Sequence, residues 1–201
     1  MIIRAFRSLR WTDYSIYAII DPRALVRILK SDPSKLFWFS YLIPFIVSFF
    51  HIITLSLLSS YATHFFYIKL TYGLIFVFFI LSFHVLIYSL LIDFIAQFLN
   101  FKGYGQLIVI ILNFSLIPLI FVLPLTYFCY ILNFAPLFFY VFFILLTLLW
   151  QWIILIQCIS ELYACDLGKA IIISIFPPLF FFLSVILVGV LFFSILYSYL
   201  S

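Results

Sequence analysis

The chain has 201 residues, of which 69% are hydrophobic and only 8% are charged. Soluble domains carry about 25% charged and roughly half apolar residues, so this composition excludes a water-soluble globular protein. Lipid solvates apolar surface that water does not, and the sequence therefore predicts an integral membrane protein. The net charge of +4 does not point to nucleic acid, because seven of the ten Lys and Arg residues lie before residue 36, just ahead of the first long apolar run.

Residues 1–35 are expected to form a cytoplasmic N-terminal segment with one basic amphipathic helix, Pro22 to Ser31. Asp21 is a suitable cap, and Pro22 fits the first helical position, where its missing N–H costs nothing. The apolar residues of this helix share one face, and its basic residues share another: Arg23, Arg27 and Lys30. Two placements stay open. The helix either lies on the membrane surface, held by anionic lipid headgroups, or caps the inner end of the helical bundle.

Residues 36–201 are expected to form a bundle of five transmembrane helices, since five apolar runs reach the length of about 20 residues that a span requires. The least marked boundary is 131–136, which contains only Asn133 and Pro136 as breaks. Without a turn there, residues 107–159 would form one helix of about 80 Å, far longer than a hydrocarbon core of roughly 30 Å. The predicted spans are Leu36 to Leu58, Tyr72 to Leu91, Leu107 to Tyr130, Leu137 to Ile159, and Ala170 to Tyr197.

The distribution of basic residues predicts the orientation of these spans. With the N-terminus inside, the loops 93–106 and 160–169 are cytoplasmic, and nine of the ten Lys and Arg residues then lie inside. Only Lys69 lies outside. Cytoplasmic loops carry an excess of Lys and Arg, so we expect a cytoplasmic N-terminus.

Polar residues within the spans are expected to face the bundle interior, where they form hydrogen bonds between helices. They follow one face of the first span and a similar stripe of the second, and they also mark the third and fourth. They are Ser40, Ser48 and His51 in the first span, Ser82, Ser89, Asp93 and Gln97 in the second, Asn113 in the third, and Gln151 and Gln157 in the fourth. The three histidines do not converge, the three cysteines have no metal-ligand spacing, and Asp93 is the only carboxylate close to a span interior. The sequence therefore predicts no catalytic residues, no metal site and no cofactor.

The region from Asp93 to Phe180 carries a recognisable order of motifs. Lys102-Gly103-Tyr104-Gly105-Gln106 begins the third span, and Pro118 lies midway along it. After the fourth span, Leu167-Gly168-Lys169-Ala170-Ile171 begins the fifth. This order resembles the Yip1 family, and Asp21-Pro22-Arg23 and Asp32-Pro33 resemble the segment before the first span in its bacterial members.

The resemblance implies a non-enzymatic membrane protein with five spans and a cytoplasmic N-terminus. Eukaryotic members bind prenylated GTPases, but this chain lacks their acidic Asp-Leu-Tyr-Gly-Pro type of motif, so a bacterial-type member that organises the membrane or binds a partner is expected. The location that this resemblance implies is the bacterial cell (inner) membrane. The expected partners are anionic lipids of the inner leaflet, with a membrane protein or a second copy of the chain as a further option. The rival class is a small transporter or permease subunit, because proline-broken spans also occur in transporters.

The expected interaction site lies on the cytoplasmic face, on the ends of the second to fifth spans. Lys169 begins a helix, where the positive end of the helix dipole disfavours a cation, so it is expected to have an anionic partner. Glu161 is the first choice, Asp93, Asp166 and a lipid headgroup are alternatives, and a lysine that reaches the interface without a partner also stays open. The predicted site residues are Asp93, Lys102, Gly103, Gly105, Glu161, Asp166, Gly168 and Lys169.

Overall fold

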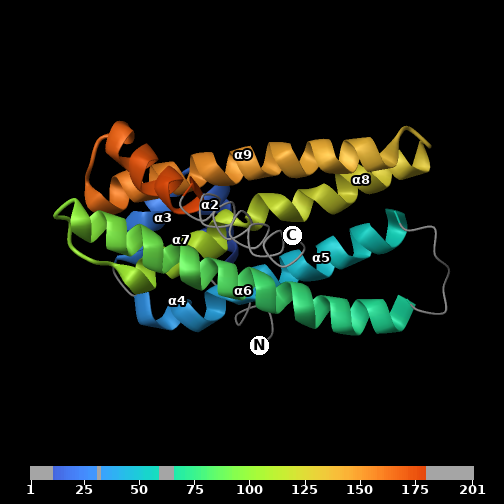
Figure 1. Ribbon diagram of the computed structural model, residues 1–201, viewed down its shortest axis with the longest axis horizontal. Coiled ribbons are helices and arrows are strands. Elements are labelled where there is room, and N and C mark those ends of the chain that lie inside the picture. Colours follow the sequence, from blue (N-terminus) through green and yellow to red (C-terminus); the bar gives the residue numbers. More distant parts are fainter. Residues whose placement is uncertain (1–10, 31–32, 59–65, 180–201) are drawn as a thin grey trace, which may run out of the picture.

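A computed structural model describes residues 11–30, 33–58 and 66–179, and within these ranges every regular element is a helix (Figure 1). A further helix, Leu167–Leu179, follows the labelled ones. The all-α architecture predicted from the sequence is therefore confirmed. The elements in chain order are α2 (Trp11–Ile20), α3 (Pro22–Leu29), α4 (Pro33–Ser40), α5 (Leu42–Leu58), α6 (Phe66–Phe98), α7 (Gly105–Ser115), the 3-10 helix η2 (Ile117–Phe121), α8 (Val122–Ile131) and α9 (Pro136–Tyr163).

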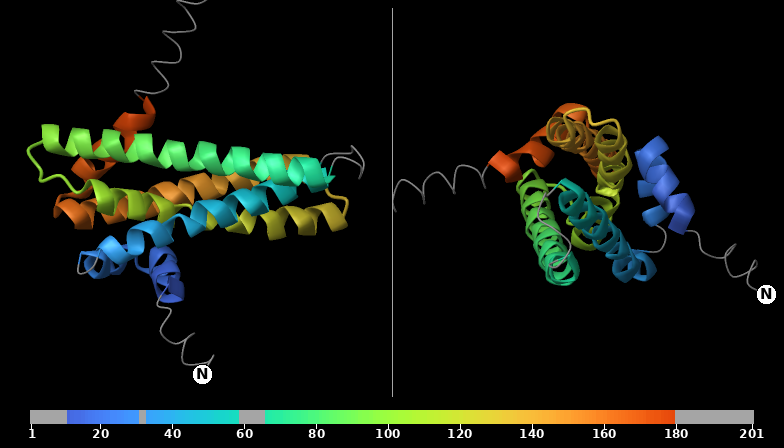
Figure 2. Two further views of the ribbon diagram at one scale, coloured as in Figure 1. Left: turned by 90° about the horizontal axis from the view of Figure 1, so that it is seen from below. Right: turned by 90° about the vertical axis from the view of Figure 1, so that its right-hand side faces the viewer.

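Four helical stretches are long and apolar enough to cross a membrane, and they lie lengthwise beside one another (Figures 1 and 2). The first has the predicted bounds, and the other three extend beyond theirs. The turn predicted near Pro136 is also present, where the Phe134 N–H donates to the Cys129 carbonyl oxygen at 3.0 Å. The four stretches are Leu36–Leu58, Leu70–Phe98, Gly105–Ile131 and Pro136–Tyr163.

The predicted fifth span, Ala170 to Tyr197, lies only partly within the described residues. The helix Leu167–Leu179 contains its first part and is by itself shorter than a span. It is joined to α6 by the hydroxyl group of Tyr88, which donates to the Ser174 carbonyl oxygen at 2.6 Å. The rest of the predicted span lies outside the described residues.

The third stretch is the central one and is interrupted in its middle. In its most apolar window, 72% of the residues are buried, against 22–33% for the other three, so protein surrounds it on most sides. The interruption is η2, in which Pro118 follows Ile117. Proline has no N–H to donate to the preceding turn, and the Leu119 N–H bonds three residues back, to the Leu116 carbonyl oxygen at 3.0 Å.

The outward faces of α6 and α9 are apolar and exposed. Phe83 is 64% exposed and Phe94 is 68% exposed on α6, and Leu149 is 63% exposed on α9. Of the polar side chains predicted to face inward, Ser40, Ser48 and Asn113 are each 0% exposed and Gln151 is 9% exposed, whereas His51 is only half-buried. A bilayer favours a protein with apolar side chains on its outer surface and polar side chains in its interior. This chain has that distribution along four apolar helical stretches, so it is a membrane protein.

Helix α3 is the predicted basic amphipathic helix, and its apolar face packs on α9. The Asp21 carboxylate caps it by accepting a hydrogen bond from the Ala24 N–H at 3.0 Å. Leu25, Val26 and Leu29 are fully buried. These contacts place the apolar face of α3 against α9 and leave Arg23, Arg27 and Lys30 exposed on its other face.

Helix α2 has no predicted counterpart. It packs beside α7 and η2, with the rings of Tyr14 and Phe114 6.3 Å apart and Ala18 fully buried. Its outer side exposes Ile16 and Ile20. Apolar residues on both sides leave this segment with no clear polar face, and that is why its sequence does not show a helix by periodicity.

Candidate functional site

The sequence-predicted site residues lie at one end of the bundle, which we call the basic end. It carries α3, the loop 99–104 and the turn 164–166, opposite the turn between α8 and α9 (Figure 1). The predicted residues do not form one cluster there. They divide into three groups, around Asp93, Glu161 and Asp166.

The first group is a hydrogen-bonded joint around Asp93, near the C-terminal end of α6. One carboxylate oxygen, Oδ1, accepts from the Tyr104 N–H at 2.8 Å and, more weakly, from the Tyr163 hydroxyl group at 3.4 Å. The other, Oδ2, accepts from Gln97 Nε2 at 2.8 Å. Both oxygens are therefore engaged with groups of the protein, and they tie α6 to the start of α7 and the end of α9.

Two of the predicted glycines lie next to this carboxylate. A Cβ atom on Gly103 would lie 2.8 Å from Gln97 Nε2 and 3.2 Å from Asp93 Oδ2. A Cβ atom on Gly105 would lie 3.7 Å from the same oxygen, an ordinary contact distance. Gly103 is therefore the position where a side chain would disturb the Asp93 joint.

Aromatic rings that were not among the predicted site residues pack around this joint. The Tyr163 ring lies 5.4 Å from the Phe101 ring and 5.8 Å from the Tyr104 ring, measured between centroids. Lys102 Nζ lies 5.9 Å from the centroid of the Tyr104 ring, at the outer limit of a cation–π contact. In a chain with 14 Tyr and 29 Phe residues, composition could not distinguish these rings from the others.

The second group corrects the prediction that Glu161 pairs with Lys169. Glu161 Oε1 lies 3.7 Å from Arg27 Nε, and its backbone carbonyl oxygen accepts from Lys30 Nζ at 3.1 Å. Helix α3 therefore brings two basic residues to Glu161 from 131 and 134 positions away in sequence. Cys158 strengthens the same contact, since its thiol donates to the Pro22 carbonyl oxygen at 3.4 Å.

The third group is the cap of the helix Leu167–Leu179. The Asp166 carboxylate accepts from the Lys169 N–H at 3.3 Å, and Lys169 Nζ lies 3.9 Å from the other carboxylate oxygen. Both side chains are more than 60% exposed, so this ion pair stabilises the fold little. Lys169 has an acidic neighbour, as predicted, but the neighbour is Asp166, one of the alternatives, and not Glu161.

Gly168 belongs to the same cap, because a Cβ atom there would lie 3.0 Å from Asp166 Oδ2. Cys165 stands just before it. Partial burial and the adjoining Asp166 carboxylate raise the pKa of the Cys165 thiol, and the Lys169 ammonium opposes this in part. The thiol is therefore less reactive at neutral pH than a free cysteine.

Polar side chains deeper in the bundle contact one another in separate pairs. Asn113 Nδ2 donates to Ser40 Oγ at 2.8 Å, whereas Asn113 Oδ1 is buried and has no hydrogen-bond partner among the described residues. The His51 ring lies beside Tyr140, and the His84 ring stacks on Tyr88 at 5.5 Å. Within residues 11–30, 33–58 and 66–179, no three His, Cys, Asp or Glu residues are grouped so that they could hold a metal ion.

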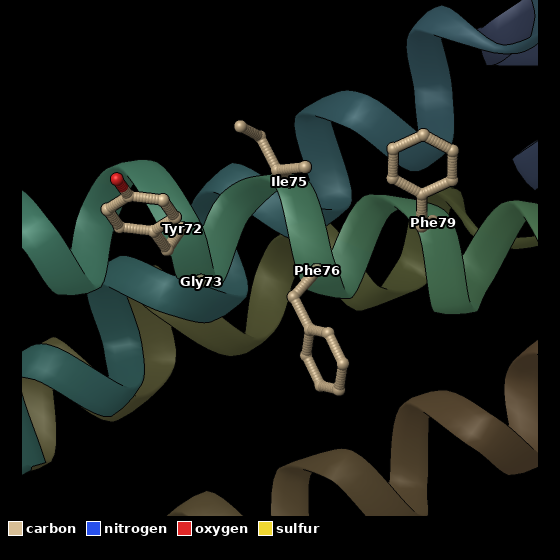
Figure 3. Close-up of a pocket in the computed structure, with 5 residues that line it drawn as sticks. All are labelled: Tyr72, Gly73, Ile75, Phe76 and Phe79. Atoms are coloured by element: carbon tan, nitrogen blue, oxygen red, sulfur yellow. The ribbon is translucent and has the colours of Figure 1, made fainter.

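A hollow on α6 is a surface feature and not a site. It is lined by Tyr72, Gly73, Ile75, Phe76 and Phe79, all from one helix (Figure 3). Tyr72 is 70% exposed, and Phe76 and Phe79 are each 66% exposed. Side chains of a single helix on an apolar outer surface are what lipid chains contact, so we assign no further role to this hollow.

The fold and these contacts define an all-helical membrane protein. Within its described residues, the side-chain contacts around Asp93, Glu161 and Asp166 at the basic end are half-buried or exposed. No protein-family model, curated protein or solved structure matches the chain.

Proposed function

We propose that this chain is a non-enzymatic integral membrane protein of the bacterial Yip1 type, which organises the membrane or binds a membrane partner through its basic end. The basic end then lies at the cytoplasmic face of the cell membrane, with anionic lipids of the inner leaflet as its first ligands. The distribution of Lys and Arg supports this orientation, because nine of ten lie toward that face.

The observation that carries the proposal is a set of exposed basic side chains on a rigid support. The apolar face of α3 is buried on α9, and this holds the basic face of α3 in a fixed place. Each basic residue near an anionic leaflet contributes about 1 kcal/mol of attraction. The exposed basic residues at this end are Arg23, Arg27, Lys30, Lys102 and Lys169.

The acidic residues of the same end support a binding role in preference to catalysis. Both carboxylate oxygens of Asp93 accept hydrogen bonds from the protein, and Glu161 faces Arg27. Asp166 caps a helix. Each of these carboxylates thus has a structural partner. The one that adjoins a thiol, Asp166 beside Cys165, raises the pKa of that thiol and so makes it less nucleophilic.

The places of the motifs also agree with what the Yip1 resemblance implies. The segment from Lys102 to Gln106 leads into α7, and Pro118 lies in the break midway along the third stretch. The segment from Gly168 to Ala170 lies in the first turn of the last described helix. These three features support the proposal, which still depends on the resemblance for the family.

A lipid co-purification experiment tests the proposal. The full chain is purified from mixed micelles of equal amounts of an anionic and a zwitterionic phospholipid, and the retained lipids are quantified by mass spectrometry. We expect enrichment of the anionic lipid, and we expect the triple variant Arg23→Gln, Arg27→Gln, Lys30→Gln to lose most of it. High salt should have the same effect, because it screens exposed charges.

The matched control is Lys69→Gln, which removes a basic residue at the opposite end of α6 and should leave the enrichment unchanged. Equal lipid ratios in the native protein and the triple variant would contradict the proposal.

The interrupted third stretch favours a second candidate, a small transporter or permease subunit. Discontinuous helices often build substrate sites near the middle of the membrane, and Asn113 Oδ1 is a buried acceptor without a partner close to η2. Solute uptake into proteoliposomes that contain the chain, absent from empty liposomes and abolished by Asn113→Leu, would favour transport over the first proposal.

A further inference from the structure

A cavity of about 300 Å³ lies between α5, α6, α8 and α9 and reaches η2. All of the elements that line it belong to the four stretches that can cross a membrane. Its walls include Val47 and Val122, each 4% exposed, and the half-exposed Ile80 on α6. Because Ile80 is exposed whereas Val47 and Val122 are buried, we infer that the cavity opens beside Ile80 toward the lipid-facing surface.

His51 is the polar member of an otherwise aliphatic lining. The Tyr140 hydroxyl group lies 3.5 Å from its Nδ1 and 3.4 Å from its Nε2. One hydroxyl group cannot form a well-directed hydrogen bond with both nitrogens, and both distances are at the outer limit for such a bond. The His51 ring is thus poorly satisfied by the protein and has hydrogen-bonding capacity to offer to a molecule in the cavity.

The size and chemistry of the cavity indicate its ligand. At roughly 30 Å³ for a water-sized group, it holds on the order of ten such groups, which corresponds to one apolar chain and not to a large headgroup. Among the described residues, none that lines the cavity is charged, and a charge without a partner is costly within a membrane. The ligand is therefore neutral and has one polar group.

A hydroxyl group suits His51 better than a carbonyl group does. A hydroxyl group both donates and accepts, so it can bond to either ring nitrogen in either tautomer, whereas a carbonyl group needs the N–H. We propose that the cavity binds the chain of a neutral long-chain alcohol that enters from the bilayer beside Ile80 and hydrogen-bonds to His51. This site is separate from the basic end and does not depend on the function proposed there.

Photo-crosslinking tests this site. The full chain in lipid nanodiscs is labelled with dodecanol that carries a diazirine on its chain, and the labelled peptides are mapped by mass spectrometry. Label should concentrate on the cavity-lining parts of α5, α6 and α8, and unlabelled dodecanol should displace it. The alkane analogue of the same probe, which lacks the hydroxyl group, should label about five-fold less, the value expected from loss of one ordinary hydrogen bond, and His51→Leu should make the two probes equal.

Two tryptophan variants of α6 provide the matched pair. Ile80→Trp places a large ring at the opening of the cavity and should abolish the displaceable label. Ile75 has the same type and exposure but does not line the cavity, so Ile75→Trp should leave the displaceable label unchanged. Label spread evenly over the lipid-facing residues, or equal displacement by dodecane and dodecanol in the unchanged protein, would overturn the proposal. The displacement comparison needs no variant, so it holds even if a substitution prevents folding.

Discussion

The Asp93 joint gives the sharpest prediction about stability. Replacement of Asp93 by Ala removes the acceptor for the Tyr104 N–H and for Gln97 Nε2, both at 2.8 Å. Hydrogen bonds to a charged group each contribute about 1.5–3 kcal/mol, and the partial exposure of this site reduces their sum, so we expect a loss of about 2–4 kcal/mol. For a chain of this size that corresponds to a fall in Tm of roughly 5–15 °C.

Graded variants separate the parts of this loss. Asp93→Asn keeps an acceptor for Tyr104 but removes the charge, so it should lose about half as much. Tyr163→Phe should lose less than about 1 kcal/mol, because its bond to Asp93 is 3.4 Å long. Gly103→Ala pushes a Cβ atom against Gln97 and should also lower Tm, by less than Asp93→Ala.

The assay is thermal unfolding of the full chain in detergent, followed by the fraction that stays monodisperse after heating. The matched control is Gln106→Ala, which removes an exposed polar side chain from the first turn of α7. A native Tm for Asp93→Ala, or a fall in Tm as large for Gln106→Ala, would refute the reasoning.

Three further predictions concern the N-terminal helix and the basic end. Leu25→Ala removes a fully buried side chain between α3 and α9 and should lower the free energy of unfolding by about 2–4 kcal/mol in the same assay. The control Ile20→Ala, at a 77% exposed position, should change it little. Equal losses would show that α3 does not pack on α9 as described. Asp166→Asn should lower the raised pKa of the Cys165 thiol and so increase its thiolate fraction at neutral pH. Maleimide should then label Cys165 faster, and an unchanged labelling rate would mean that the carboxylate does not act on the thiol. In intact cells, a membrane-impermeant thiol reagent should leave Cys165 unlabelled and should react with a cysteine placed at Lys69, and the reverse pattern would invert the proposed orientation.

The class of the protein and the positions of its long helices could be predicted from the sequence because both follow from local properties. Hydropathy summed over about 20 residues decides whether a stretch can cross a bilayer, and no other part of the chain alters that sum. The predicted Leu36 to Leu58 is found with the same bounds, and the inward-facing Ser40, Ser48 and Asn113 follow from the energetic cost of polar groups toward lipid. The Asp21 cap is equally local, since its partner is only three residues away.

Only the tertiary structure decided which charged groups meet. The loop after α9 is short, so sequence alone favoured Glu161 as the partner of Lys169, but α3 returns from the N-terminus and places Arg27 and Lys30 beside Glu161. Asp93 could likewise be picked out as a carboxylate near a span end, while its contacts with Tyr104 and Tyr163 depend on where three helix ends converge. The physical reason is the same in each case: hydropathy is additive along the chain, whereas hydrogen bonds and ion pairs depend on distances of a few ångströms between residues that can lie more than a hundred positions apart.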